Sequence, residues 1–210
     1  NLKQLRMKHQ LPKNGKKFLV MILNTNMDKT NLEVIRESFG RVSYSHKTHE
    51  KEVEIQSRYA TIVKWVNIGL IAITTGSLLG ALFAGQTLVV IGAIFSALTL
   101  GFSIYQLSFD PENKAIRHKQ VANSLWLIRE KYVNLMADII NGHLKEDGIA
   151  KCRDELLNEL DVVYKSAPET SGKAYKMAQQ ALKIDEELTF SDKELNQLLP
   201  TSLHINGSKK

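Results

Sequence analysis

Two histidines and a glutamate have the spacing best suited to chemistry in this chain. His46, His49 and Glu50 follow the i, i+3, i+4 pattern that places three side chains on one face of a helix, and imidazole and carboxylate groups can bind zinc. One helix supplies too few ligands for a closed site, and the expected helix pairing sets His118 level with Gln56, about 10 Å further along. We therefore expect no metal, and interpret both histidines as polar positions in a helix–helix interface.

The same histidines could make that interface sensitive to pH. Imidazole changes its charge near physiological pH, so protonation of His46 and His49 would weaken the pairing of the helices. This hypothesis predicts that replacing both residues by leucine abolishes any change in activity between about pH 5.5 and 7.5.

Sequence motifs of enzymatic chemistry are missing. The chain has no phosphate-binding loop, dinucleotide glycine pattern, nucleophile elbow or carboxylate pair. Its one cysteine, Cys152, has the apolar neighbours Ile149 and Leu156, so we expect it to be buried rather than catalytic. We expect a non-enzymatic protein without a cofactor.

A stripe of uncharged polar residues is the second pattern with functional potential. Several copies of such a stripe can line an aqueous pore, although isolated Ser and Thr in membrane helices usually bond to their own backbone. A wall without charge would discriminate weakly between ions. The candidate pore-lining residues are Asn67 and Thr74 in one apolar segment and Ser96, Thr99, Ser103 and Gln106 in the next.

These polar residues lie within one long uncharged run. From Trp65 to Phe109 the chain contains no Asp, Glu, Lys, Arg or His, and this run is about twice the ~20 residues that cross a bilayer. A break at Ala84-Gly85-Gln86-Thr87 divides it into two spans, roughly Val66–Phe83 and Leu88–Leu107. The run predicts a transmembrane helical hairpin.

Both spans carry small residues at every fourth position. Such faces let helix backbones approach closely. The contact could form within the hairpin or between protomers, and the sequence favours neither. The small residues are Gly76, Gly80 and Ala84 in the first span and Ala93, Ala97 and Gly101 in the second.

Heptad patterns flank the hairpin on both sides, in residues 31–64 and 110–142. A short hairpin loop brings both helices out on one side of the membrane, so we expect them to pair as an antiparallel coiled-coil stalk that starts level at Lys64 and Asp110. This pairing places His49 opposite Leu125 and His46 opposite Ile128. Trp126 and Arg129 lie off the seam and are available for a further interface. The stalk and oligomerisation candidates are Phe39, Val42, His46, His49, Leu125, Trp126, Arg129 and Tyr132.

The remaining segments complete an all-α membrane protein. Residues 1–30 are basic and expected to be poorly ordered, residues 143–200 form a C-terminal helical region, and residues 201–210 a disordered tail. The hairpin itself occupies residues 65–109 between the two stalk helices.

The distribution of charge predicts topology and a lipid partner. The net charge is +6, and Lys and Arg gather at the ends of the apolar run, away from its uncharged loop. The positive-inside rule then places both termini in the cytoplasm. A basic N-terminal segment can also bind nucleic acid, but no interleaved aromatic residues support that alternative, and we expect it to meet anionic lipid instead.

Segments on either side of the hairpin resemble a known family. Phe39–Lys51 and Ala122–Tyr132, together with Asp138, resemble the SLATT family, which comprises bacterial two-transmembrane effectors found beside nucleotide-sensing, nucleotidyltransferase and reverse-transcriptase immunity genes. The resemblance covers about residues 35–190.

The resemblance implies a homo-oligomeric effector of the bacterial inner membrane. Such an effector would form a pore or disrupt the membrane in anti-phage, abortive-infection defence. A cytoplasmic sensor, a nucleotide signal, a nucleotidyltransferase or a reverse transcriptase would be its partner. The alternative is a membrane anchor that recruits a sensor or reverse transcriptase without forming a pore.

Overall fold

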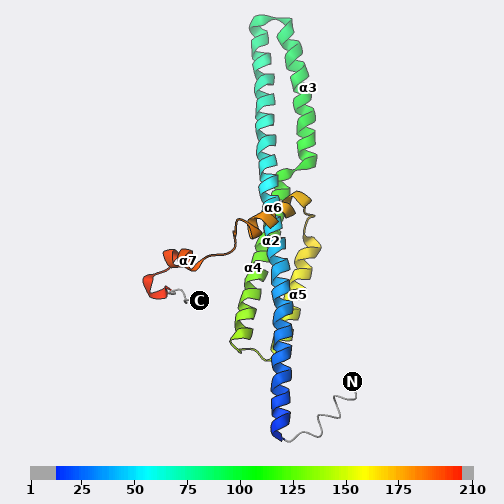
Figure 1. Cartoon of the computed structure of the whole chain (residues 1–210). Coiled ribbons are helices and arrows are strands. Elements are labelled where there is room, and N and C mark those ends of the chain that lie inside the picture. The colour runs from blue at the N-terminus through cyan, green and yellow to red at the C-terminus, as the bar shows by residue number, and fades with distance from the viewer. Residues whose placement is uncertain (1–12, 205–210) are drawn as a thin grey trace. The chain divides into compact units, whose positions relative to one another are not determined.

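Every regular element in the described part of the chain is helical (Figure 1). The computed structural model describes the backbone of residues 13–204 and the side chains of residues 31–204 apart from Ala84. The all-α prediction is therefore confirmed. The elements are α2 (Lys13–Ala84), α3 (Gln86–Phe109), α4 (Pro111–Ile140), α5 (Glu146–Ser166), α6 (Gly172–Lys183), α7 (Asp192–Leu198) and the 3-10 helix η1 (Thr201–Leu203).

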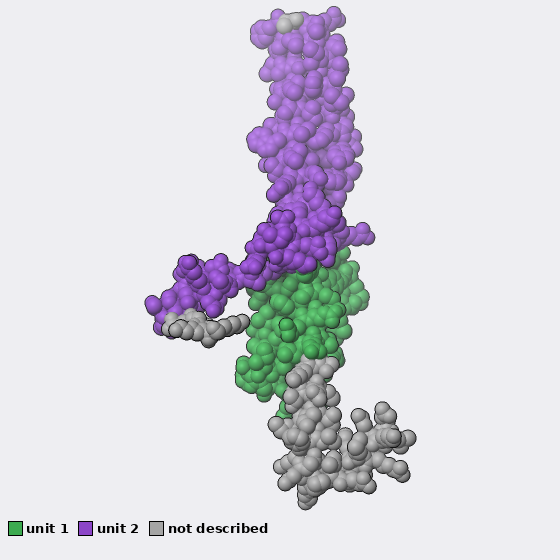
Figure 2. All heavy atoms as spheres, viewed as in Figure 1, with its two compact units in different colours: residues 1–46, 121–167 green, residues 47–120, 168–210 purple. Residues whose placement is uncertain are grey.

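The chain divides into two compact units, which Figure 2 shows in separate colours. Unit 1 comprises residues 1–46 and 121–167, and unit 2 comprises residues 47–120 and 168–210. The helices α2 and α4 each contribute one part to each unit. Each unit has its own packing.

Unit 1 is built around an apolar core shared by α2, α4 and α5. The heptad pattern of α4 buries one side chain every three or four residues, and α5 adds its own apolar face as a third helix rather than as part of a separate region. The buried core residues are Ile35 and Val42 of α2, Val121, Leu125, Ile128, Tyr132 and Leu135 of α4, and Ile149, Leu156 and Leu160 of α5.

Helix α4 begins and ends where its sequence predicts. Asp110 adopts a left-handed conformation with φ 35°, and its carboxylate accepts a hydrogen bond from the backbone amide of Asn113, as expected of an N-cap. Pro111 occupies the first turn, where its missing amide hydrogen costs nothing. At the other end Gly142, with φ 69°, follows the last helical residues.

Unit 2 contains the apolar hairpin and the short helix α6. Ser171 caps α6 by accepting a hydrogen bond from the amide of Ala174. The buried face of α6 consists of three alanines, Ala174, Ala178 and Ala181, whose small side chains allow close packing. A capping box starts α7, because Ser191 and Glu194 each accept a hydrogen bond from the other's backbone amide.

Candidate functional site: the apolar hairpin and the polar contacts of unit 2

The hairpin turns on a single residue. Helix α2 ends at Ala84 and α3 begins at Gln86, so Gly85 alone connects them. Its φ of 87° lies where an L side chain is strained. The predicted break is confirmed, although Gln86 and Thr87 belong to α3 rather than to the turn.

The apolar side chains of the hairpin are exposed. Both helices contain an 18-residue window long and apolar enough to cross a membrane, with mean hydropathy 1.8 and 2.2, and only 6% of each window is buried. Phe83 is 92% exposed and Leu107 is 82% exposed. A core helix of a water-soluble protein would hide such residues, whereas an apolar helix without a protein cover suits a bilayer.

Polar and small residues form the contact between the two helices of the hairpin. The Oγ1 atoms of Thr74 and Thr99 are 3.4 Å apart. Ser77 is buried, and a Cβ added at Gly92 would lie 3.4 Å from its Cβ. Each threonine hydroxyl also donates to a carbonyl of its own helix, Leu70 or Phe95. The inside of the hairpin is therefore more polar than its outside.

The predicted pore-lining residues do not share one exposed face of the hairpin. Thr74 and Thr99 face each other inside the hairpin, and the Ser103 hydroxyl donates to the carbonyl of Thr99. Ser96 is exposed on the outside of α3, whereas Asn67 and Gln106 are half-buried. In a single chain these six residues do not form one open polar surface, because most of them lie against the neighbouring helix.

The small residues also have different surroundings. Gly80 packs against α3, since a Cβ added there would lie 2.9 Å from the Cδ1 of Leu88. Gly76 and Gly101 have nothing within 4 Å of an added Cβ, and Ala93 and Ala97 are exposed. The stripe in α3 therefore does not pack within the hairpin. Contact between protomers stays a prediction for this stripe. Ala84 ends α2, and its side chain is outside the described part.

The histidine pairing corrects the predicted register. In unit 2 the Nδ1 atom of His49 lies 2.9 Å from the Nδ1 atom of His118, so His118 is not displaced to the level of Gln56. In unit 1 the Nδ1 atom of His46 lies 3.0 Å from the carbonyl oxygen of Ala122. Both contacts fall close to one heptad nearer the start of α4 than predicted.

The position of the turn explains part of this shift. Pairing Lys64 with Asp110 implies a turn centred on Thr87, whereas the turn lies at Gly85. The rings of Tyr59 and Phe109 accordingly meet edge to face, 6.4 Å apart. The charged residues that bound the apolar run are therefore not level with each other.

Burial favours the neutral form of His118. His118 is 4% exposed, and this burial lowers its pKa; the charge of Glu52 opposes the shift and that of Arg117 adds to it. Burial raises the pKa of Glu52, but the hydrogen bonds from Ser171 outweigh it, so the net shift is downward. A neutral His118 beside an ionised Glu52 is the favoured state.

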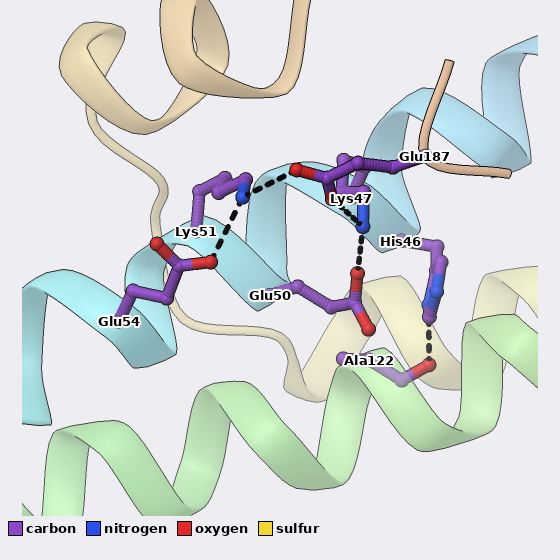
Figure 3. Close-up of polar contacts among 7 residues, drawn as sticks. All are labelled: His46, Lys47, Glu50, Lys51, Glu54, Ala122 and Glu187. Atoms are coloured by element: carbon purple, nitrogen blue, oxygen red, sulfur yellow. Dashed lines mark hydrogen bonds and ion pairs between the residues drawn. The ribbon is translucent and has the colours of Figure 1, made fainter. Parts of the chain in front are cut away.

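Two lysines of α2 bind the segment that follows α6 (Figure 3). The Lys47 ammonium lies 2.6 Å from Glu50 and 2.7 Å from Glu187, and the Lys51 ammonium lies 2.8 Å from Glu54 and 3.2 Å from Glu187. Burial lowers the pKa of both lysines, but the hydrogen bonds that they donate to these carboxylates raise it more. The hydrogen bond from Lys47 in turn lowers the pKa of Glu187.

A second contact binds the start of α6 to the same helix. The Glu52 carboxylate, which is buried, accepts a hydrogen bond from the backbone amide of Ser171. Helix α6 is thus held to α2 at its N-cap residue, Ser171, and at Glu187, four residues after its end. We call these contacts of Glu52 and Glu187 the α6 clamp.

The stalk candidates of unit 1 lie mainly in its core. Val42, Leu125 and Tyr132 are buried, while Phe39 packs against them half-exposed. Trp126 is 50% exposed, in line with its predicted place off the seam.

Arg129, which was also predicted off the seam, binds a neighbour on its own helix. Its Nε and Nη2 atoms both donate to Glu130.

Sequence reasoning missed the α6 clamp and the partner of His49. Continuing the heptad pattern of α4 three residues back from Val121 reaches His118, so that residue was within reach. No comparable pattern links Glu187 to Lys47. Within residues 31–204 no group of three or more His, Cys, Asp or Glu side chains could hold a metal ion.

Comparison with known proteins gives one match. The model of the SMODS and SLOG-associating 2TM effector domain family 4 matches residues 32–194. This range runs from within α2 to the first residues of α7. No curated protein and no solved structure matches.

Proposed function

Because the chain belongs to the SMODS and SLOG-associating 2TM effector domain family 4, we propose that it is a homo-oligomeric effector that forms a pore in, or disrupts, the bacterial inner membrane. A cytoplasmic sensor or a nucleotide signal would trigger it during phage infection. Its membership makes it a membrane effector of a defence system, and the resemblance found in the sequence is confirmed.

The hairpin is the observation that carries this proposal. It is apolar outside, where lipid would contact it, and contains Thr74, Thr99 and Ser77 inside. Two helices cannot enclose water, but several hairpins in a ring can. The exposed small residues of α3, Ala93, Ala97 and Gly101, offer a surface on which neighbouring hairpins could pack closely.

To line an open pore, the polar side chains inside the hairpin would have to become exposed. As α2 and α3 stand, Ser96 alone of the four α3 candidates is exposed. A lumen lined by Thr74 and Thr99 needs the two helices to separate or rotate. Both hydroxyls donate their hydrogen to carbonyls of their own helices, so their contact with each other does not prevent such a change.

Dye leakage from liposomes tests the proposal. The full chain, reconstituted with and without the product of a neighbouring sensor gene, should release a small dye faster than it releases a large one. Replacing Ser96, Thr99 and Ser103 together by Leu should preserve insertion but reduce leakage at least about tenfold, because an apolar wall excludes water. Thr75→Leu is the matched control, since Thr75 is an exposed polar residue of α2 outside the candidate stripe. Undiminished leakage in the triple variant would show that the stripe lines no pore.

A membrane anchor for a sensor or reverse transcriptase is the second candidate. The exposed apolar pair Trp126 and Leu127 on α4 favours it, because each is 50% exposed in a part of the chain that carries charge. An anchor would bind its partner through these residues and leave liposomes intact. Leakage by the full chain would exclude this alternative as its only role.

A further inference from the structure

Helix α4 carries a second row of residues with heptad spacing, in addition to the row that packs in the core of unit 1. Its members follow one another at intervals of three and four residues, as in the seam of a coiled coil. At 3.6 residues per turn this row lies on the face of α4 opposite its buried face. The row consists of Asn123, Trp126, Glu130, Val133, Ala137 and Ile140, and we call it the outer row of α4.

The apolar side chains of the outer row are exposed. Trp126 is 50%, Val133 is 41% and Ile140 is 73% exposed. A helix that packs on a core through one face normally carries charged residues on the opposite face. Glu130, however, is the only charged residue of the outer row. Helix α4 therefore has the composition of a helix that packs on both faces, although the described part of the chain covers only one of them.

The outer row would not repel an identical row. Its one charged residue, Glu130, is neutralised by its neighbour, because the Nη2 atom of Arg129 lies 2.6 Å from the Glu130 carboxylate. Arg129 is in turn the only charged residue among the positions that border the row. These bordering positions are Ala122, Arg129 and Met136 on one side and Leu127, Asn134 and Asn141 on the other. Two copies of this face can therefore meet without bringing unpaired like charges together.

The order of residues in the outer row suits a parallel pair of helices. In heptad notation Trp126, Val133 and Ile140 occupy d positions, and Asn123 occupies an a position. An asparagine at one a position of a parallel coiled coil specifies register and the number of strands, at a cost in stability. Two facing asparagines can do so because each side-chain amide both donates and accepts hydrogen bonds.

A shared membrane also favours parallel pairing in register. Copies whose hairpins cross one membrane with the same topology hold equivalent residues at the same depth. An antiparallel pairing centred on Val133 would instead place Trp126 of one copy beside Ile140 of the other. Confinement to the membrane also raises the effective concentration of each copy near the next. A short and partly polar seam such as the outer row can then be sufficient.

We propose that the outer row of α4 is a contact surface between two copies of this chain, which pair parallel and in register. Trp126, Val133 and Ile140 of one copy each pack against the same residue of the second copy. The inference rests on the proposed function, because it names one interface of the proposed homo-oligomer. It assigns Trp126 to the contact between copies rather than to a site for a sensor protein.

Disulfide formation between copies tests the alignment. In a Cys152→Ser background, Val133→Cys and Ile140→Cys are introduced one at a time in the full chain, which is reconstituted in liposomes at low density and mildly oxidised. Each variant should form a linked dimer, because facing d positions are close enough for a disulfide. Val162→Cys is the matched control, since Val162 is 68% exposed on α5, and it should stay monomeric. A dimer with Val133→Cys but none with Ile140→Cys would overturn the parallel alignment.

A charge exchange tests whether Val133 faces itself. Association is measured by fluorescence energy transfer between copies labelled at the C-terminus, in liposomes and without an activator. Val133→Glu and Val133→Lys should each weaken association at least about tenfold, because two unpaired like charges would face each other out of water. A mixture of the two variants should restore energy transfer, since each carboxylate then meets an ammonium group. Val162→Glu and Val162→Lys should associate as the parent chain does.

The same exchange at Ile140 applies if the Val133 variants lose their helical circular dichroism, because Ile140 is 73% exposed and tolerates a charge in the single chain. Full association of the Glu variant, or no recovery in the mixture, would overturn the proposal and leave the homo-oligomer with a different interface. A parent chain that is monomeric in liposomes would contradict both this contact and the homo-oligomeric effector. Variants that associate normally but no longer bind a sensor protein would assign the outer row to that partner.

Discussion

At the residue scale, the contact between the two buried histidines of unit 2, His49 and His118, depends on their protonation states. The Nδ1 atoms of His49 and His118 lie 2.9 Å apart, so one ring donates and the other accepts. When both rings carry two protons, two donors face each other and the contact is lost. The sequence predicted that His49 would be a polar interface residue, but the identity of its partner depended on a register that the sequence did not determine.

Acid should therefore destabilise the parent chain through His118. Its pKa is lowered in the folded state, mainly by burial, so the unfolded chain binds more protons below about pH 6.5 and stability falls as the pH drops from there. The thermal midpoint in detergent should be lower at pH 5.5 than at pH 7.5. His118→Gln should flatten this dependence, because glutamine keeps a hydrogen-bonding group without titrating.

His143→Gln serves as the control for that measurement. His143 is exposed at the end of α4, and its Nδ1 atom lies 3.4 Å from the Asp138 carboxylate. Its replacement should leave the slope of stability against pH unchanged. An unaltered slope in the His118 variant would show that another group controls the pH response, and would weaken the histidine hypothesis for the His46 and His49 pair as well.

At the element scale, heptad spacing predicts which helices form but not how they align. The buried face of α4 extends past Val121 to His118 and Ala115, so a shift of one heptad still matches apolar residues with apolar residues. The sequence therefore permits two registers, and the single-residue turn at Gly85 selects between them. The attachment of α6 could not be predicted, because it depends on contacts between residues far apart in the chain.

Breaking the α6 clamp should loosen this helix. Glu187→Gln removes the carboxylate that binds Lys47 and Lys51, whose side chains are 8% and 12% exposed, and leaves each lysine with one carboxylate on α2. Amide hydrogen exchange within α6 should accelerate on the order of tenfold, because a charge-assisted hydrogen bond stabilises by roughly that factor. Exchange in the core of α5 should not change.

Asp185→Asn is the control for the clamp. Asp185 is an exposed acidic residue two positions before Glu187, so it changes the net charge equally without touching the lysines. If the amides of α6 exchange equally slowly in the Glu187 variant and the parent chain, packing of its buried alanines alone holds this helix in place.

At the scale of the whole molecule, two spans without charge were predictable from hydropathy alone. The uncharged run forms two long helices with exposed apolar surfaces. Helices suit a bilayer because each backbone N–H and C=O group forms its hydrogen bond within the helix. The sequence could not show that Thr74 and Thr99 face each other. Helical spacing places a residue on a face but does not decide which neighbour that face meets.

The proposed pore is tested most directly by measuring dye leakage while a disulfide holds the two helices of the hairpin together. In a Cys152→Ser background, Thr74→Cys and Thr99→Cys place two thiols where hydroxyls 3.4 Å apart now lie, close enough for a disulfide. Thr74→Cys alone is the control. The oxidised double variant, reconstituted in liposomes with its activator, should hold its dye, and reduction should release it at the rate of the control. Equal leakage before and after reduction, or none from any variant, would contradict a pore formed by opening of the hairpin.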